Sequence, residues 1–156
     1  MQISANGLSF IEHEEGSRTT VYHDSRGFLT VGVGHLVLPQ DDLHFGDKIT
    51  PQQVDKFLQK DLAWVQDTIN NNTSNIVLNQ NQFDALCSLV FNIGAHNFIF
   101  NSSVLRDIKV GDFSSAADAF LMWRRAGSLP NELLPRRERE RTLFLTPVEE
   151  TTNATL

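Results

Sequence analysis

The sequence has a single cysteine and no long apolar run, and both absences exclude classes of protein. Cys87 has no partner for an internal disulfide, and its place in the apolar stretch 83–91 predicts a buried structural thiol. A catalytic cysteine would need a paired histidine and an electropositive setting, and neither is indicated. No window reaches the ~18 apolar residues of a membrane span, so we expect no membrane insertion.

Basic charge is also scarce, because 13 lysines and arginines stand against 19 acidic residues, a formal net charge of −6. Nucleic-acid-binding proteins usually carry a basic balance or patch, so we expect no nucleic-acid partner. The five histidines and the cysteine lack metal-ligand spacing, which predicts no metal site. The N-terminus has no basic leader followed by an apolar run, so we expect synthesis in the cytoplasm without a signal peptide.

A length of 156 residues, with 40% hydrophobic and 21% charged residues, suits one globular domain with an adequate core. No repeat with a fixed period and no long low-complexity linker divides the chain. We therefore expect a single domain over 1–156, with a polar and flexible tail over 146–156.

The first helix and the hairpin after it hold the candidate chemistry. Apolar residues at helical spacing predict a helix that ends at Glu15, and Gly16 can take the left-handed conformation that closes it. Residues 19–22 favour a strand, 24–27 form a turn cluster, and 28–33 are predicted as the returning strand. Three candidate catalytic side chains thus lie on neighbouring elements: Glu15, Asp24 and Thr30.

A carboxyl group at a helix end that faces a second carboxylate on a hairpin is suited to glycoside cleavage. One carboxyl protonates the departing oxygen, while the other supports an attacking water or an oxocarbenium-like transition state. The hydroxyl of Thr30 is suited to holding that water. The residues alone leave another interpretation open, in which Glu15 is a solvated helix-end residue, Asp24 a turn aspartate and Thr30 a strand former.

The remaining sequence predicts helices. A capping box at Thr50 and Gln53 marks the start of a helix over about 51–70 with one apolar face. A second capping pattern at 79–82 precedes a largely apolar helix over 80–93, which would form the core of its lobe. Three shorter helices complete the prediction: 102–110, 114–123 and about 134–145.

The pattern Glu-Gly, Tyr-x-Asp and Gly-x-x-Thr-x-Gly-x-Gly-His within 15–35 closely resembles the phage-type lysozymes, or endolysins, of glycoside hydrolase family 24. The resemblance covers roughly 4–145. It extends to four further stretches: 78–86, 91–94, Trp123 to Ala126, and Arg136 with Arg137.

This resemblance implies an α+β lysozyme-like fold that is mostly helical. A small hairpin-bearing N-lobe would span about 12–60, and a long joining helix would span about 51–70. A larger helical C-lobe would span about 71–145 and include the first helix, and the two lobes would enclose a saccharide cleft.

The resemblance also implies a muramidase, which hydrolyses the β-1,4 bond between N-acetylmuramic acid and N-acetylglucosamine in bacterial peptidoglycan. Glu15 would be the general acid, Asp24 the carboxylate that assists the water or stabilises positive charge, and Thr30 the residue that positions the water. No cofactor is needed. Because Thr30 is placed to share a water with Asp24, we expect inversion of the anomeric configuration.

Substrate contacts are expected from Asn92, Gly34 and Phe28. The amide of Asn92 equally suits hydrogen bonds to nearby backbone groups, and that interpretation stays open. Trp123 is predicted to be a core residue, since an aromatic side chain at helical spacing from Phe120 is more often buried than sugar-binding.

Two supporting contacts are also expected. The resemblance places Arg137 beside Glu15, whereas the alternating charges over 136–141 by themselves indicate a solvated helix face. His35 and Asp61 are expected to form a partly buried ion pair with a structural role.

Other functions stay open on the sequence alone. One is a non-catalytic peptidoglycan-binding module, because a fold does not by itself confer activity. The other is a chitinase or lytic transglycosylase on the same scaffold. The expected partners are bacterial peptidoglycan and an inhibitor or immunity protein, and we expect a monomer. Action in the periplasm or cell wall would require delivery by a holin or a secretion machine.

Overall fold

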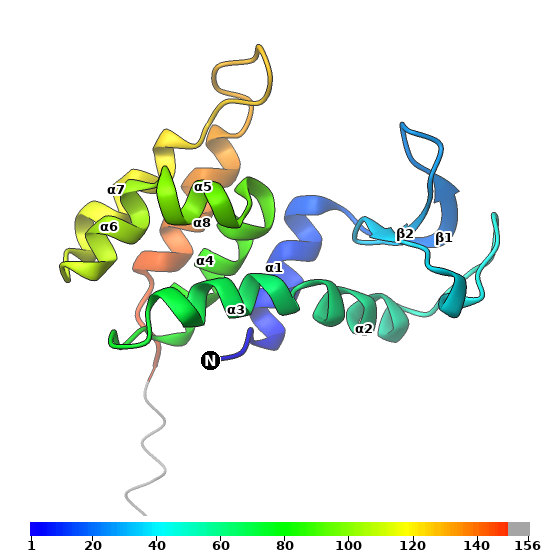
Figure 1. Cartoon of the computed structure of the whole chain (residues 1–156), viewed down its shortest axis with the longest axis horizontal. Helices are drawn as coiled ribbons and strands as arrows, with labels where there is room; N and C mark the ends of the chain where they lie inside the picture. The colour runs from blue at the N-terminus through cyan, green and yellow to red at the C-terminus, as the bar shows by residue number, and fades with distance from the viewer. Residues whose placement is uncertain (150–156) are drawn as a thin grey trace, which may run out of the picture. The chain divides into compact units, whose positions relative to one another are not determined.

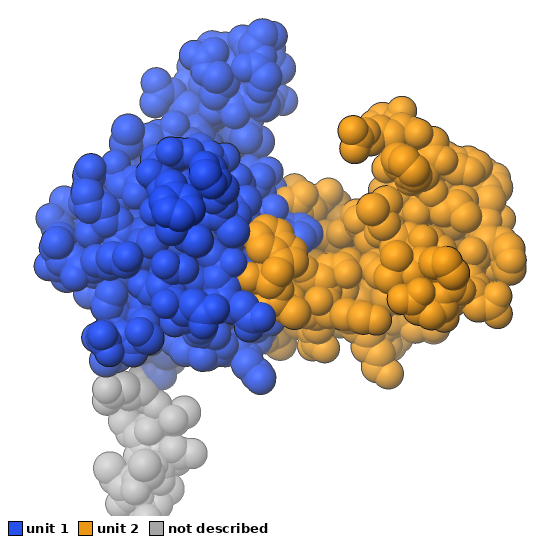
Figure 2. All heavy atoms as spheres, in the orientation of Figure 1, with its two compact units in different colours: residues 1–4, 65–156 blue, residues 5–64 orange. Residues whose placement is uncertain are grey.

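The structure is a computed structural model that describes residues 1–149. Contacts divide the chain into two compact units, which Figure 2 draws in different colours. The hairpin unit is Ala5–Trp64, and the helical unit is Met1–Ser4 together with the chain from Val65 onward. Most of the tail that the sequence predicts to be flexible, residues 150–156 of 146–156, lies outside the described residues.

The hairpin unit contains a small antiparallel sheet with the strand order β1-β2-β3 (Figure 1). The helix before the sheet packs against the helix after it. In chain order the elements are α1 (Ala5–Glu15), β1 (Arg18–His23), β2 (Leu29–Gly32), β3 (His35–Leu36), the 3-10 helix η1 (Pro39–Asp41) and α2 (Pro51–Asp61).

Strand β1 is paired along both of its edges. On one side β2 runs antiparallel to it, with Tyr22 opposite Thr30. On the other side lies the segment 46–49, where the N–H of Val21 donates to the carbonyl of Asp47 over 2.8 Å. An internal strand has its backbone groups satisfied by neighbours, so the turn that follows β1 starts from a fixed position.

The predicted helix over 51–70 is interrupted at Leu62, so it is two helices rather than one. The predicted capping box is confirmed, because Thr50 Oγ1 accepts from the N–H of Gln53 over 3.1 Å. Helix α2 nevertheless ends at Asp61, and α3 (Ala63–Asn72) begins two residues later. Leu62 has φ −87° and ψ −1°, and this ψ lies far from the helical value near −42°.

The helical unit is built around α4 and α8, which form its most extensive helix pair. The capping pattern at its start is confirmed, because Asn79 Oδ1 accepts from the N–H of Gln82 over 2.8 Å. Beyond α3, its elements are α4 (Gln80–Ile93), α5 (Ala95–Phe100), α6 (Ser103–Lys109), α7 (Phe113–Ala119), the 3-10 helix η2 (Phe120–Met122) and α8 (Leu134–Leu145).

The core of the helical unit is aromatic and aliphatic. Phe83 and Leu86 of α4 are fully buried, as are Phe120 and Phe144, whose ring centroids lie 5.3 Å apart. Cys87 is fully buried beside them on α4, and burial raises the pKa of its thiol far above the ordinary value. The prediction of a structural rather than catalytic cysteine is therefore confirmed.

These elements confirm the α+β class, with helices dominating and one small sheet. The first helix groups with the hairpin unit, whereas the sequence analysis placed it with the C-lobe. One predicted helix also starts earlier than expected, since Asp112 rather than Ser114 caps α7 by accepting from the N–H of Ser115. Within residues 1–149, no helix combines the length and apolar character needed to cross a bilayer.

Candidate active site

Glu15 is the last residue of α1, and its side chain is exposed. Gly16 ends the helix with φ +82°, and its N–H donates to the carbonyl of Glu12 over 2.9 Å. A residue with a Cβ would be strained at this φ, so glycine allows the chain to leave the helix sharply. The helix end predicted from the sequence is confirmed, and it presents a carboxyl group immediately before β1.

Asp24 follows β1 and is held by the turn that it begins. Its Oδ1 accepts from the N–H of Arg26 over 2.8 Å and from the N–H of Phe28 over 2.9 Å. Among the described residues, no hydrogen bond uses its Oδ2, which remains available for a water or a substrate. Two backbone donors on one oxygen fix the orientation of the carboxylate.

Thr30 lies on β2 and is only 3% exposed. Its hydroxyl donates to the carbonyl of Phe28 over 3.0 Å. Tyr22 is its cross-strand partner, and Asp24 follows the end of β1 two residues beyond Tyr22. A pleat that continued past His23 would turn Asp24 and Thr30 to the same face of the sheet.

Gly34 and Phe28, both predicted to contact substrate, lie in the turns at the two ends of β2. Gly34 has φ +67° and joins β2 to β3. Phe28 has a side chain that is 56% exposed, while its backbone N–H and carbonyl bind Asp24 and Thr30. The exposure of the Phe28 ring makes it accessible to a ligand.

His35 is buried between two carboxylates. Its Nδ1 lies 2.8 Å from Asp61 Oδ2, which confirms the predicted ion pair, and its Nε2 lies 2.8 Å from Asp41 Oδ2. Phe57 stacks on the imidazole ring at a centroid distance of 4.1 Å. Each ring nitrogen thus faces a carboxylate oxygen, and the imidazole links Asp61 to Asp41.

Asp41 is the partner that the sequence analysis missed. Burial acts to raise the pKa of this carboxyl, but the N–H of Leu38, His35 and the charge of Lys60 outweigh burial and lower it. The cluster connects β3, η1 and α2. Because each ring nitrogen of His35 has a carboxylate partner, the structural role predicted for His35 fits this geometry.

Glu12 was also missed, and it is a carboxyl with an unusual pKa. Burial first, and then a hydrogen bond and charge repulsion from Asp55 of α2, raise the pKa of Glu12 to about 7. Its Oε1 is buried without a hydrogen-bond partner. A raised pKa is typical of a general acid, but one oxygen of Glu12 is buried and the carboxyl contacts Asp55 of α2, so we assign it a structural role.

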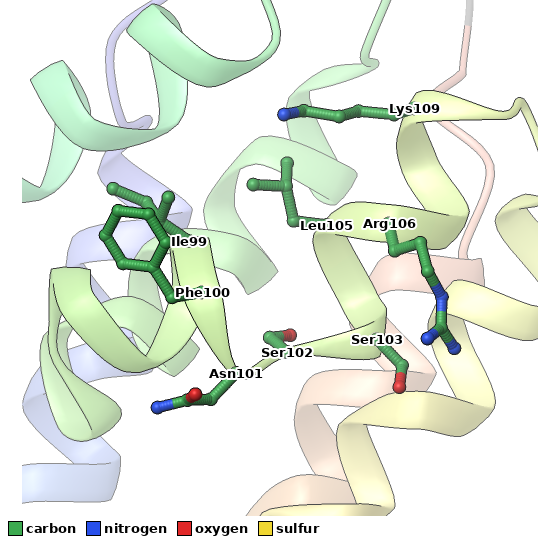
Figure 3. A pocket seen from close by; sticks show the side chains of 8 residues that line it. All are labelled: Ile99, Phe100, Asn101, Ser102, Ser103, Leu105, Arg106 and Lys109. Carbon is green, nitrogen blue, oxygen red and sulfur yellow. The ribbon is translucent and has the colours of Figure 1, made fainter.

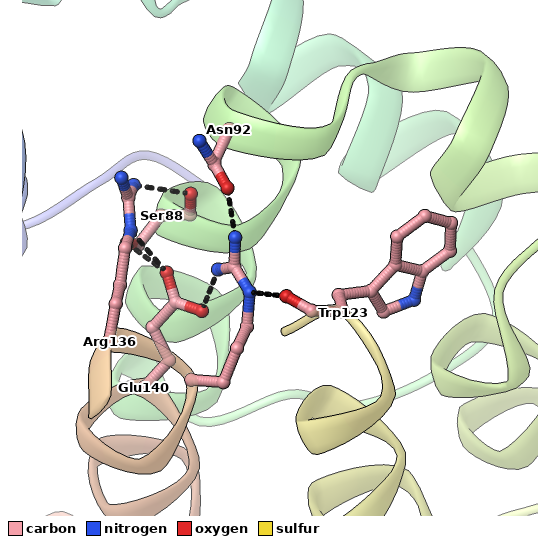
Figure 4. Close-up of polar contacts among 6 residues, drawn as sticks. Ser88, Asn92, Trp123, Arg136 and Glu140 are labelled. Carbon is pink, nitrogen blue, oxygen red and sulfur yellow. Dashed lines mark hydrogen bonds and ion pairs between the residues drawn. The ribbon is translucent and has the colours of Figure 1, made fainter. Parts of the chain in front are cut away.

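Figure 4 shows the polar network around Arg137 in the helical unit. Arg137 is fully buried, and it forms an ion pair with Glu140, which is also fully buried. Its Nε donates to the carbonyl of Trp123 over 2.7 Å, and its Nη2 donates to Asn92 Oδ1. Arg136 binds the same Glu140 over 3.1 Å.

The network corrects the interpretation of 136–141 as a solvated face, because Arg136, Arg137 and Glu140 are all buried. Trp123, predicted to be a core residue, has a side chain that is only partly buried. Its contact with Arg137 is made by its backbone carbonyl. Glu15 belongs to the other unit, so the expected pairing of Arg137 with Glu15 stays a prediction.

The helical unit also has a pocket of about 360 Å³ between α5 and α6, which Figure 3 shows from close by. Ser102 and Leu105 form part of its lining, and Arg106 and Lys109 add two basic side chains. No residue of this pocket belongs to the predicted site.

A carboxyl at a helix end, a second carboxylate fixed by a hairpin turn and a hydroxyl on the returning strand, within a mostly helical α+β fold, define a lysozyme-type glycoside hydrolase. The family model for phage lysozyme matches residues 12–140. The chain belongs to the phage lysozyme family, which confirms the resemblance found in the sequence and the peptidoglycan-hydrolysing class of activity.

Known proteins are similar to this chain over nearly its whole length. The endolysin of Salmonella phage P22 is 49% identical over 146 residues, which are 93% of this chain and 99% of that protein. A crystal structure of a P22 lysozyme mutant is similar with a TM-score of 0.88 and covers 94% of this chain and 99% of its own. The muramidase domain of SpmX from Asticaccaulis excentricus is 34% identical with a TM-score of 0.79, and the match covers 94% and 99% of the two chains.

Proposed function

We propose that this member of the phage lysozyme family cleaves the β-1,4 bond between N-acetylmuramic acid and N-acetylglucosamine with Glu15, Asp24 and Thr30 as its catalytic residues. The observation that carries the proposal is the Asp24 turn. Two backbone donors hold Oδ1, and Oδ2 is left available just beyond β1, the strand that pairs with the one carrying Thr30. A metal or cofactor is not required by this chemistry.

Glu15 acts as the general acid in this mechanism. Its exposed position at the end of α1 lets it approach the glycosidic oxygen and donate a proton to the leaving sugar. As the bond breaks, positive charge develops at the anomeric carbon and the ring oxygen. The negative charge of Asp24 stabilises that charge and attracts the attacking water.

Thr30 and Asp24 orient the water through complementary hydrogen bonds. The hydroxyl hydrogen of Thr30 is used in the bond to the Phe28 carbonyl, so Oγ1 accepts a hydrogen from the water. Asp24 Oδ2 accepts the other hydrogen and takes the proton as the oxygen attacks. A lone pair of the water then points at the anomeric carbon, on the face opposite to the departing sugar.

Attack by a held water inverts the anomeric configuration, whereas attack by Asp24 itself would retain it. Inversion needs the two carboxyl groups to stand about 6.5–9.5 Å apart, and retention needs about 5–5.5 Å. We therefore expect the α-anomer as the first product of the β-linked glycan, which NMR of fresh digests detects. A β-anomer, or a glycosyl adduct trapped on Asp24, would contradict the water-mediated scheme.

Thr30→Val tests the water-binding role and has a matched control in Thr30→Ser. Valine keeps the shape and the buried setting but cannot accept a hydrogen, so kcat should fall about 10²- to 10³-fold with KM little changed. Serine keeps the oxygen and should retain most of the activity. Equal activity of Thr30→Val and wild type would return Thr30 to a purely structural role.

The remaining site residues support this reaction in our proposal. Asn92, Gly34 and Phe28 bind the glycan, Arg137 helps to orient Glu15, and His35 with Asp61 stabilises the hairpin unit. Arg137 has the rigidity that such a role needs, since its guanidinium is held by Glu140 and Asn92. We further propose that 1–156 acts as one lysozyme-like domain and as a monomer, open to binding by an inhibitor or immunity protein.

The family acts on the cell wall, and we propose that this chain reaches it by a holin or a dedicated secretion machine. Loss of turbidity in suspensions of permeabilised cells tests the activity, and analysis of the released fragments tests its type. Reducing sugar ends indicate hydrolysis. Anhydro ends would instead identify a lytic transglycosylase, and binding without loss of turbidity would identify a non-catalytic module.

A further inference from the structure

The hairpin unit has an open groove of about 530 Å³ that none of the predicted site residues lines. Its floor is β1 with the residue before it, and its far wall is the loop that carries Phe45. The side chains that give it chemical character are Arg18, Thr20, Tyr22 and Phe45.

Arg18 is an unpaired cation on the floor of this groove. Its guanidinium carbon lies 4.2 Å from the centroid of the Tyr22 ring, in a cation–π contact. Among residues 1–149, no carboxylate forms an ion pair with Arg18, although the chain carries a net charge of −6. No hydrogen bond to another described residue uses the guanidinium N–H donors of Arg18, so they are open to a carboxylate, which an arginine binds through two hydrogen bonds.

Phe45 supplies an apolar wall that is 65% exposed. Its ring stacks on His23 at a centroid distance of 4.7 Å with only 17° between the planes. The neighbouring Gly46 donates its N–H to the carbonyl of Val21 over 3.0 Å, which ties the loop to β1. An exposed aromatic side chain on a fixed loop is therefore ready to bind an apolar group without a rearrangement.

The register of the sheet connects the groove to the proposed reaction centre. Tyr22, whose ring forms the cation–π contact with Arg18, is the direct cross-strand partner of Thr30. Directly opposite side chains on antiparallel strands have Cβ atoms about 4.5–5.5 Å apart. A glycan whose scissile bond lies at Asp24 and Thr30 would thus carry its substituents to the edge of the groove.

We propose that this groove binds the stem peptide that peptidoglycan carries on its muramic acid, with Arg18 pairing with a peptide carboxylate. The inference rests on the proposed muramidase function. An acidic peptide is the substituent that complements a lone guanidinium, and its aliphatic side chains complement the Phe45 ring. In peptidoglycan the lactyl carboxyl of muramic acid is bound in an amide to the peptide, so the peptide is the part of the polymer that offers free carboxylates to Arg18.

The test compares two substrates, intact peptidoglycan and peptidoglycan whose peptide carboxylates have been amidated. Arg18→Ala should raise KM on intact peptidoglycan about 5- to 20-fold with kcat little changed, because a charge-assisted hydrogen bond is lost in ground and transition state alike. On the amidated substrate Arg18→Ala should match wild type. Arg18→Lys keeps the charge but not the fork of donors, and should give an intermediate KM.

Arg106→Ala is the control for loss of one exposed positive charge, since Arg106 is 73% exposed and lies in the helical unit. It should leave both substrates unaffected. An equal rise in KM for Arg18→Ala on both substrates would show that the groove binds sugar. An unchanged KM on both would show that the groove binds no part of the substrate during turnover. Both results overturn the inference while leaving the proposed function standing.

A binding measurement separates the groove from catalysis. A free muramyl peptide should shift the NMR signals of the Tyr22 and Phe45 rings in the wild type and not in Arg18→Ala. The same peptide with its carboxylates amidated should give no shift. Shifts that survive either amidation or Arg18→Ala would exclude carboxylate recognition, whether or not the enzyme turns over.

Discussion

Replacing Glu12 with glutamine should stabilise the protein at pH 8 and leave its stability unchanged at pH 4. Burial and the Asp55 contact raise the pKa of Glu12 from an ordinary 4.5 to about 7. Between these two values the folded protein keeps a proton that the unfolded chain releases, so the free energy of unfolding falls as pH rises. The penalty is absent below pH 4.5 and complete above pH 7. Glutamine carries no charge, so Glu12→Gln removes this penalty.

The size of the effect follows from the two pKa values. Their difference, at about 1.4 kcal/mol for each pH unit, sets an upper bound of about 3.5 kcal/mol on the penalty. The Glu12 side chain is partly exposed, and solvent screening reduces this to about 1–2 kcal/mol. For a chain of this length such a gain raises Tm by about 3–6 °C.

Thermal unfolding followed by circular dichroism at pH 4 and pH 8 measures the effect. Glu138→Gln is the matched control, because Glu138 is an exposed glutamate on α8 and the same chemical change there should be neutral at both pH values. A Tm gain for Glu12→Gln that is equal at the two pH values would refute the electrostatic argument. So would the absence of a gain at pH 8.

The remaining predictions concern the two catalytic carboxyls and the His35 cluster. Glu15→Gln should fold normally and lose nearly all hydrolysis in a turbidity assay, because an amide cannot donate the required proton; wild-type turnover would remove Glu15 from the mechanism. Asp24→Asn should leave more residual rate, because nearby dipoles share the electrostatic role, and full activity would make Asp24 a turn residue only. His35→Asn should lower the stability at pH 5.5 by roughly 3 kcal/mol, since it leaves two carboxylates facing each other; an unchanged melting curve would exclude a stabilising pair. The pKa of Asp41 is lowered in the folded protein, so the stability that this carboxylate contributes is present above the unfolded value near ~3.9 and is lost as pH falls through the folded value. Asp41→Asn should therefore be less stable than wild type near neutral pH and equally stable in strongly acidic buffer.

Local signals in the sequence predicted the elements that depend on local chemistry. The capping boxes at Thr50 and Asn79 need only a side chain and a backbone N–H three residues on, and both are present. The helix end at Gly16 and the turn after β1 depend likewise on residues next to one another. Such features are readable from sequence because the interacting groups are close along the chain.

The features that the sequence did not predict depend on contacts between distant segments. Leu62 interrupts the predicted long helix without a glycine or proline, so no local signal marks the break. The charges over 136–141 alternate as on a solvated face, yet Glu140 is satisfied by Ser88 of α4 as well as by two arginines. The second partner of His35, Asp41, comes from the 3-10 helix η1, whose position the pattern of residues did not fix.

The turn at 24–30 shows how the catalytic groups are held by backbone rather than by side-chain packing. Phe28 donates its N–H to Asp24 Oδ1 over 2.9 Å, and its carbonyl accepts the Thr30 hydroxyl over 3.0 Å and the Asp24 N–H over 2.8 Å. One peptide segment therefore orients both groups that we propose to hold the water. Since the backbone does this, the Phe28 side chain is free to remain 56% exposed, where it can contact the glycan at no cost to the geometry of the turn.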